Sequence, residues 1–109
     1  MLTDFTKQFW PKYLRGHSSV GNRVCHYIGS LVALCGLAIS VQLGSADLLM
    51  ASVAVAYLCA WVGHFFFEHN VPETLFRPGY SALGNWCMFG LWISGRLQPH
   101  LDVHLRAAD

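Results

Sequence analysis

The hydrophobic residues of this chain gather in long uncharged runs that are separated by short polar segments. No charged residue occurs from Val24 to Ala46, from Leu48 to Phe67, or from Pro78 to Gly95. Each run approaches or exceeds the roughly 20 residues that a helix needs to cross a hydrocarbon core. The first two runs predict membrane helices over residues 20–43 and 48–67, and the polar sequence between them predicts a tight turn. Together they predict a helical hairpin.

Two shorter segments complete the expected architecture. Apolar residues recur at helical spacing in residues 3–15, which predicts an amphipathic helix lying in the membrane interface and ending at Gly16. A third apolar helix is expected over residues 82–97; it is short for a full span, so tilted, re-entrant and interfacial placements all remain open. Residues 98–109 are expected to form a polar, soluble or frayed tail. We therefore expect an all-α fold in one membrane-embedded domain, residues 1–109.

Composition and charge support a membrane location. The chain is 54% hydrophobic and only 12% charged, against roughly 25% charged residues in an average soluble domain. A net charge of +1 without a basic block argues against a nucleic-acid partner. Basic residues precede the first run whereas the turn carries only Asp47, which predicts that the N-terminus is cytoplasmic. We expect an integral protein of the bacterial inner membrane or the eukaryotic endoplasmic reticulum.

Two histidines are placed symmetrically in the predicted hairpin. His26 and His64 lie at equal sequence distances on either side of Ser45. In antiparallel helices each arm rises roughly 28 Å at about 1.5 Å per residue, so both imidazoles reach the same, cytoplasmic level. Each also lies on a helix face made mostly of small residues, which lets another helix approach closely. These faces are Ser30, Ala33, Leu37, Ser40 and Gly44 with His26, and Ser52, Ala56, Tyr57, Ala60 and Glu68 with His64. We expect the two rings to face each other.

Further polar residues at this level form a candidate metal site. His17, His26 and His64, with Glu68, offer nitrogen and oxygen ligands that suit Zn(II) or Fe(II). Glu68 is a candidate ligand, orienting group or proton acceptor, and Asn22 is a second candidate catalytic residue. His69 is a possible fourth ligand, although on a helix it points about 100° away from Glu68. Alternatively, these residues only cap helix ends and meet water.

Two other groups of residues are open to two interpretations. His100 and His104, with Asp102 between them, have the i, i+4 spacing of a helical metal clip, but a polar amphipathic end is the favoured interpretation. A set of aromatic residues forms either a belt at the membrane interface or the lining of an acyl-chain groove. This set consists of Trp61, Phe65, Phe66, Phe67, Trp86 and Trp92.

Three segments carry a resemblance to a known family: FWPKYLRGH at 9–17, NRVCHYIG at 22–29 and WVGHFFFEHNVP at 61–72. They resemble small membrane proteins long catalogued as a domain of unknown function. That family includes the fungal endoplasmic-reticulum dioxygenase of phytosphingosine breakdown. The resemblance covers about residues 5–97. Its pattern, H-x4-N-x3-H-x2-G followed by G-H-x3-E-x3-P, corresponds here to His17, Asn22, His26, Gly29, Gly63, His64, Glu68 and Pro72.

The resemblance implies Fe(II)-dependent, O2-using alpha-oxidation, which shortens a 2-hydroxy fatty acid by one carbon. It also implies that His17, His26 and His64 are the metal ligands. The chain departs from the family at Asn85, where short members tend to have an acidic residue, and at His69, where Lys or Arg is commoner. The first departure argues against Asn85 as a ligand.

Two other functions remain open on the sequence. The same histidines suit a zinc-dependent membrane hydrolase that uses a metal-bound water. A non-enzymatic membrane adaptor is the other alternative, with histidines that satisfy helix ends and small-residue faces that pack against a larger complex. The expected partners are a 2-hydroxy fatty acid or related lipid and the membrane itself, and a homo-oligomer is possible.

Overall fold

The computed structural model describes residues 2–106, which are mostly helical and contain no β-strand. This confirms the expected all-α fold. Two short segments are π-helices and one is a 3₁₀-helix; all three are labelled η. The elements are α1 (Leu2–Asp4), η1 (Phe5–Phe9), α2 (Trp10–Arg15), α3 (Val20–Leu43), α4 (Ala46–Val62), η2 (Gly63–Glu68), η3 (Glu73–Leu75), α5 (Pro78–Ile93) and α6 (Leu97–Arg106).

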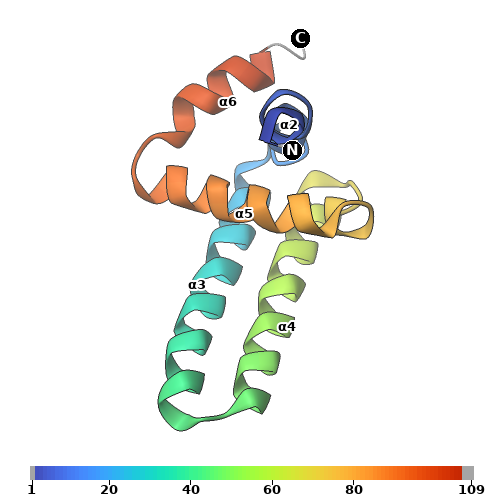
Figure 1. Cartoon of the computed structure of the whole chain (residues 1–109). Coiled ribbons are helices and arrows are strands. Elements are labelled where there is room, and N and C mark those ends of the chain that lie inside the picture. Colours follow the sequence, from blue (N-terminus) through green and yellow to red (C-terminus); the bar gives the residue numbers. More distant parts are fainter. Residues whose placement is uncertain (1, 107–109) are drawn as a thin grey trace.

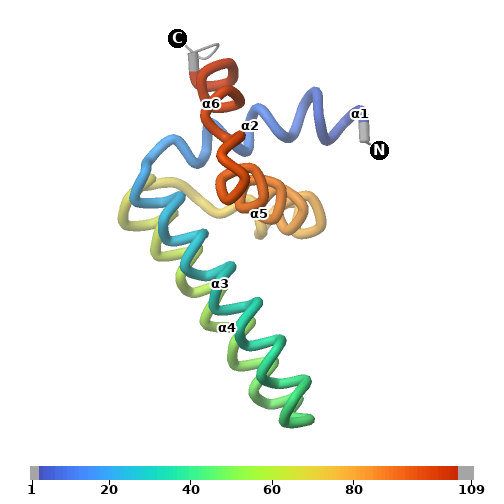
Figure 2. Tube along the Cα trace, turned by 90° about the vertical axis from the view of Figure 1, so that its left-hand side faces the viewer, coloured from blue at the N-terminus to red at the C-terminus, as the bar shows by residue number. Residues whose placement is uncertain are grey.

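The predicted hairpin is present: α3 runs antiparallel to α4, which continues into η2 (Figures 1 and 2). Its helix ends follow from local chemistry. Ser19 caps α3, because its side chain accepts a hydrogen bond from the backbone N–H of Asn22. Gly44 ends α3 in the left-handed conformation, at φ 64°. Ser45 then caps α4 by accepting from the N–H of Leu48 at 3.1 Å.

Small residues bring the two long helices close together. A Cβ atom added to Gly29 would lie 2.7 Å from the carbonyl oxygen of Ala56, and one added to Gly36 would overlap the Ser52 side chain. Gly29 and Gly36 are two turns apart and so share one face of α3, but neither was on the predicted α3 face, whereas Ser52 and Ala56 were on the predicted face of α4. The prediction is wrong at Leu37, which is 46% exposed.

The outer faces of the hairpin are apolar and exposed. Val20–Leu43 and Ala46–Glu68 have mean hydropathies of 1.9 and 1.8, and both helices are long and apolar enough to cross a membrane. Only 33% and 17% of their most apolar windows are buried inside the protein. The core helix of a soluble protein would be mostly covered, so these outer faces fit contact with lipid.

Helix α5 lies across the hairpin near its histidine end instead of running alongside it (Figures 1 and 2). This crossing distinguishes α5 from the two long helices, and its placement relative to a membrane stays a prediction. The helix starts and ends closer to the N-terminus than the predicted range 82–97. Pro78 starts it, as proline does readily in a first turn. The helix ends at Ile93, before Gly95 at φ 74°.

The expectation of a frayed tail is wrong for the part of 98–109 that the structure describes. Helix α6 contains all of the described part of this tail. Leu97 and Leu101 of α6 are buried in the core. Their i, i+4 spacing gives α6 an apolar stripe that packs beside α2. His100 accepts a hydrogen bond from Trp10 Nε1 at 3.2 Å. Among described residues, neither His100 nor His104 belongs to a metal-binding group.

The N-terminal segment is helical over residues 2–15 and amphipathic, as predicted. Its apolar face, however, covers protein and does not lie open to lipid. Its residues Phe5, Phe9, Trp10, Tyr13 and Leu14 are buried in one cluster with Tyr27, Met88, Phe89, Leu97 and Leu101. The core therefore lies beyond the histidine end of the hairpin. This packing fixes the end of α2, immediately before His17.

Candidate metal centre

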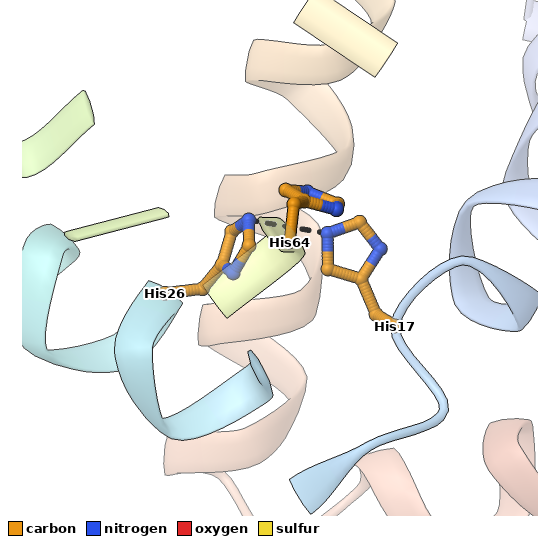
Figure 3. Close-up of side chains that lie close together, drawn as sticks. All are labelled: His17, His26 and His64. Atoms are coloured by element: carbon orange, nitrogen blue, oxygen red, sulfur yellow. Dashed lines mark hydrogen bonds between the residues drawn. The ribbon is translucent and has the colours of Figure 1, made fainter. Parts of the chain in front are cut away.

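His17, His26 and His64 converge in the interior, at the junction of the hairpin and the core. All three side chains are buried, and one nitrogen of each lies within 4.8 Å of the others. The ring centroids are 4.5 to 4.9 Å apart. Figure 3 shows the three rings turned toward one another. His17 comes from the connector between α2 and α3 (residues 16–19), His26 from α3 and His64 from η2. The expected approach of His26 and His64 is thus confirmed.

Each ring is oriented through its Nδ1 atom by an oxygen acceptor. His17 Nδ1 lies 2.6 Å from the carbonyl oxygen of Tyr13, and His26 Nδ1 lies 2.9 Å from that of Asn22. His64 Nδ1 lies 2.7 Å from Asn70 Oδ1. These oxygens can only accept, so we assign the proton to Nδ1 in all three rings. The Nε2 lone pairs are then left to the centre of the cluster.

The spacing of these lone pairs suits a metal ion. The Nε2 atoms of His17 and His26 are 3.1 Å apart. Nitrogens bound to one ion at about 2.1 Å lie roughly 3.0 to 3.4 Å from each other in tetrahedral or octahedral geometry. Lone pairs that face each other repel, and a shared cation removes that repulsion. The His17 and His26 pair therefore has the spacing of two ligands to one ion, and a nitrogen of His64 lies within 4.8 Å of both.

The surroundings of His17 favour the neutral form of its ring. Burial lowers the pKa of His17 well below its usual value of 6.5, and the neighbouring His26 and His64 rings lower it further. The backbone contact with Tyr13 acts in the opposite direction but does not prevail. Metal ligation requires the neutral imidazole, which is the form that this environment favours.

Glu68 and Asn22 hold the framework of the cluster. The Glu68 carboxylate accepts from Ser18 Oγ at 2.7 Å, from the Ser19 N–H at 2.8 Å and from Asn22 Nδ2 at 3.1 Å. Asn22 also donates to the carbonyl oxygen of Gly16 at 3.2 Å. These contacts tie the end of η2 to the start of α3, where a carboxylate also meets the positive helix end.

The contacts of these two residues therefore favour one of the predicted roles. The Glu68 oxygens accept hydrogen bonds from Ser18, Ser19 and Asn22, and the carboxylate lies outside the group of three histidines. The side chain of Asn22 is likewise engaged by Gly16 and Glu68, while its backbone oxygen orients His26. Glu68 lies outside the group of three histidines that could hold a metal, and a part for either residue in proton transfer stays a prediction.

His69, the predicted fourth ligand, does not join the three histidines of the cluster. It is exposed and adopts the left-handed conformation, at φ 58°. That conformation ends η2 and turns the chain, so the side chain of the next residue, Asn70, reaches back to His64. The turn excludes His69 and supplies Asn70 instead.

Sequence reasoning did not assign a role to Asn70. Its Oδ1 atom accepts from His64, and its Nδ2 atom donates to the carbonyl oxygen of Gly16 at 3.0 Å. The available signal was a polar amide directly after the predicted helix end, a position where asparagine often bonds locally. Asn70 links the third histidine to the connector that carries the first.

The π-helix η2 contributes to this geometry. It starts at Gly63, immediately before His64, and π-helical turns are frequent at functional sites. A Cβ atom on Gly63 would overlap Asn22 Oδ1. Glycine therefore lets α3 and η2 approach closely beside the histidines.

A cavity of about 220 Å³ adjoins the cluster between α3, α4 and α5. His26 and His64 line one part of it, together with Tyr13, whose ring stacks on His17 at 4.0 Å. The hairpin contributes small residues of the two predicted faces, Ser30, Ala33, Ala56 and Ala60, and also Gly29. Those faces thus serve the cavity as well as helix contact.

The aromatic set divides between the two interpretations. Trp61 and Trp86 line the cavity, whereas Phe65, Phe66 and Phe67 are each about half exposed or more on η2. Asn85 also lines the cavity, and its Nδ2 atom donates to Ser30 Oγ at 3.0 Å. This contact links the Asn85 amide to α3.

Comparison with known proteins identifies the family. No curated protein and no solved structure matched the chain significantly. A family model described as 2-hydroxy-palmitic acid dioxygenase Mpo1-like matches residues 3–97. This match includes all three histidines, Asn22, Glu68 and Asn70. The chain therefore belongs to the 2-hydroxy-palmitic acid dioxygenase Mpo1-like family.

Proposed function

We propose that the protein is an Fe(II)-dependent dioxygenase that converts a 2-hydroxy fatty acid into the fatty acid one carbon shorter. The observation that carries the proposal is the convergence of three buried imidazoles, with every Nδ1 bonded to an oxygen, beside a cavity of about 220 Å³. Family membership supports the reaction class.

The three histidines are the residues that would hold the iron. Bound Fe(II) would supply O2 activation and would attract the oxygens of the substrate. His17, His26 and His64 are neutral donors, and Glu68 is engaged elsewhere, so the ligand set leaves the charge of the ion uncompensated. This favours an anionic ligand such as the carboxylate of a 2-hydroxy acid, with the adjacent hydroxyl as a second oxygen.

The remaining residues prepare the site. The Tyr13, Asn22 and Asn70 oxygens fix the direction of each ring, as outer contacts do in metal sites. Burial excludes bulk water from the three rings. The overall reaction balances without an added reductant: the 2-hydroxy acid and O2 give the shortened acid, CO2 and water.

We further propose that the histidine level faces the cytoplasm. Lys7, Lys12, Arg15 and Arg23 lie on that side of the hairpin, and the distant turn carries only Asp47. The two membrane-length helices support insertion of the hairpin. A single-chain lipid would then reach the cavity from the bilayer.

The test is anaerobic reconstitution of the purified protein with Fe(II), followed by addition of 2-hydroxypalmitate with and without O2. We expect O2 uptake, CO2 release and pentadecanoate in equal amounts, with no turnover without O2. His64→Ala abolishes turnover, whereas the matched variant His69→Ala retains it. Equal turnover with Zn(II) or without O2 would overturn the proposal in favour of a hydrolase. Failure to retain stoichiometric metal, together with no turnover, would favour an adaptor.

A further inference from the structure

One buried polar group beside the metal centre lacks a protein partner. Within the described residues, three buried side-chain atoms have no hydrogen-bond partner: Asn22 Oδ1, Tyr27 OH and Trp61 Nε1. Only Trp61 lines the cavity. An indole N–H can only donate, and a buried donor normally has an acceptor. The wall of the cavity therefore contains a buried donor without a protein acceptor, one turn along the hairpin from His64.

The residues that line the cavity extend along both long helices, away from the histidines. Ala33 follows His26 by two turns on α3, which places its level about 10 Å away along the helix. On the other helix, Val53 lies about 16 Å from the level of His64. Val53 and Tyr57 line the cavity and are 41% and 43% exposed, so the cavity opens on the lipid-facing surface.

The volume of the cavity limits the size of the ligand that it can hold. About 220 Å³ is less than the roughly 300–1,000 Å³ of typical small-molecule sites. A space of this size suits one acyl chain better than the two chains of a membrane lipid. Small side chains such as Gly29, Ala33 and Ala60 leave this space open between the helices.

We propose that this cavity binds a free 2-hydroxy fatty acid, with its chain along Ala33 and Val53 and with Trp61 Nε1–H donating to a carboxylate oxygen. The identity of the head group rests on the function proposed above. Trp61 is then a substrate-binding residue that contacts the acid and not the metal.

A first experiment tests the Trp61 contact. Trp61→Phe keeps an aromatic ring and removes the donor. Anaerobic binding of 2-hydroxypalmitate to the Fe(II)-loaded protein should weaken by about 10-fold or more, with metal content unchanged. Trp92→Phe is the matched control, because Trp92 stacks on Tyr27 outside the cavity. Unchanged affinity in Trp61→Phe would overturn the contact.

A second experiment tests the path of the chain. Ala33→Phe fills the cavity two turns from His26, whereas Ala38→Phe places the same ring on the exposed side of α3. We expect Ala33→Phe to lose binding of long-chain 2-hydroxy acids and to keep short-chain ones, with the control binding both. An equal loss of binding for acids of all chain lengths, or no loss of binding, would overturn the proposed path of the acyl chain.

Photolabelling separates this inference from the proposed function. A 2-hydroxy fatty acid with a mid-chain diazirine is photolysed on the anaerobic protein, and the attachment site is mapped by mass spectrometry. Labels near Ala33 or Val53 support the cavity, even if no O2 uptake follows, in which case the proposed reaction alone fails. Labels confined to outward residues such as Leu34, in a protein that turns over, overturn the cavity alone.

Discussion

The Nε2 atoms of His17 and His26 lie 3.1 Å apart, while the Nδ1 atom of each ring contacts the backbone carbonyl oxygen four residues earlier. The same i−4 contact thus orients a histidine in α3 and one just beyond α2. His64 obtains its acceptor from a side chain, Asn70. The backbone of two elements and one amide side chain together set the ligand geometry.

Removal of any one histidine should remove the metal. His17→Ala, His26→Ala and His64→Ala each delete one of three ligands, so we expect metal per chain to fall to near zero and activity to be lost. The loss should exceed the roughly 10–100-fold that an outer contact costs. Metal analysis after anaerobic Fe(II) loading measures this. His69→Ala, whose side chain lies outside the cluster, should load fully; a metal-free His69→Ala would contradict the site.

Asn70 should act through His64. Asn70→Ala removes the acceptor of His64 Nδ1, and we expect metal affinity to fall by about 10–100-fold. Asn70→Asp retains an oxygen acceptor and should preserve more of that affinity, although it loses the donor to Gly16. Titration with a competing chelator measures both. Equal effects of the two variants would argue against this role.

Glu68 should matter for stability more than for proton transfer. Glu68→Ala leaves the Ser19 N–H and Asn22 Nδ2 without their acceptor, so we expect a loss of about 1–3 kcal/mol in unfolding free energy. The pH dependence of the remaining activity should match that of the unchanged protein. A missing limb in that pH profile would instead identify Glu68 as the proton acceptor of the reaction.

The hairpin should be sensitive to one methyl group at Gly29. Gly29→Ala places a Cβ atom 2.7 Å from the Ala56 carbonyl oxygen, and we expect destabilisation of about 1–3 kcal/mol. Gly90→Ala is the control in α5, because nothing lies within 4 Å of the added atom. That variant should be neutral or gain up to about 1 kcal/mol from helix propensity. Thermal unfolding in detergent compares them; equal melting temperatures would refute the close contact.

Acid should destabilise the metal-free protein. The pKa of His17 is well below 6.5 in the folded state and near 6.5 when unfolded, so protons bind the unfolded chain preferentially. The contribution of neutral His17 is therefore complete above pH 6.5 and is lost as the pH falls toward the folded pKa. We expect the melting temperature to drop between pH 7 and pH 5, and His17→Gln to reduce that drop. A drop of the same size in His17→Gln would contradict this origin.

Much of the fold was predictable because its signals are local. Apolar runs, Ser19 and Ser45 at helix starts and Gly44 at a helix end define the hairpin within one or two residues. The equal spacing of His26 and His64 about the turn then brings them together. The tail was mispredicted because the stripe of Leu97 and Leu101 has meaning only once a partner surface covers it.

The sequence by itself determined the two membrane-length helices, their turn and the common level of two histidines, because periodicity and capping depend on neighbouring residues. Only the tertiary structure decided that α2 packs on α5 and α6 and so delivers His17 to the other two rings. It also decided that Glu68 accepts a hydrogen bond from the connector, that His69 adopts the left-handed conformation outside the cluster, and that Asn70 contacts His64 Nδ1. These outcomes depend on which distant surfaces bury each other, which no local pattern encodes.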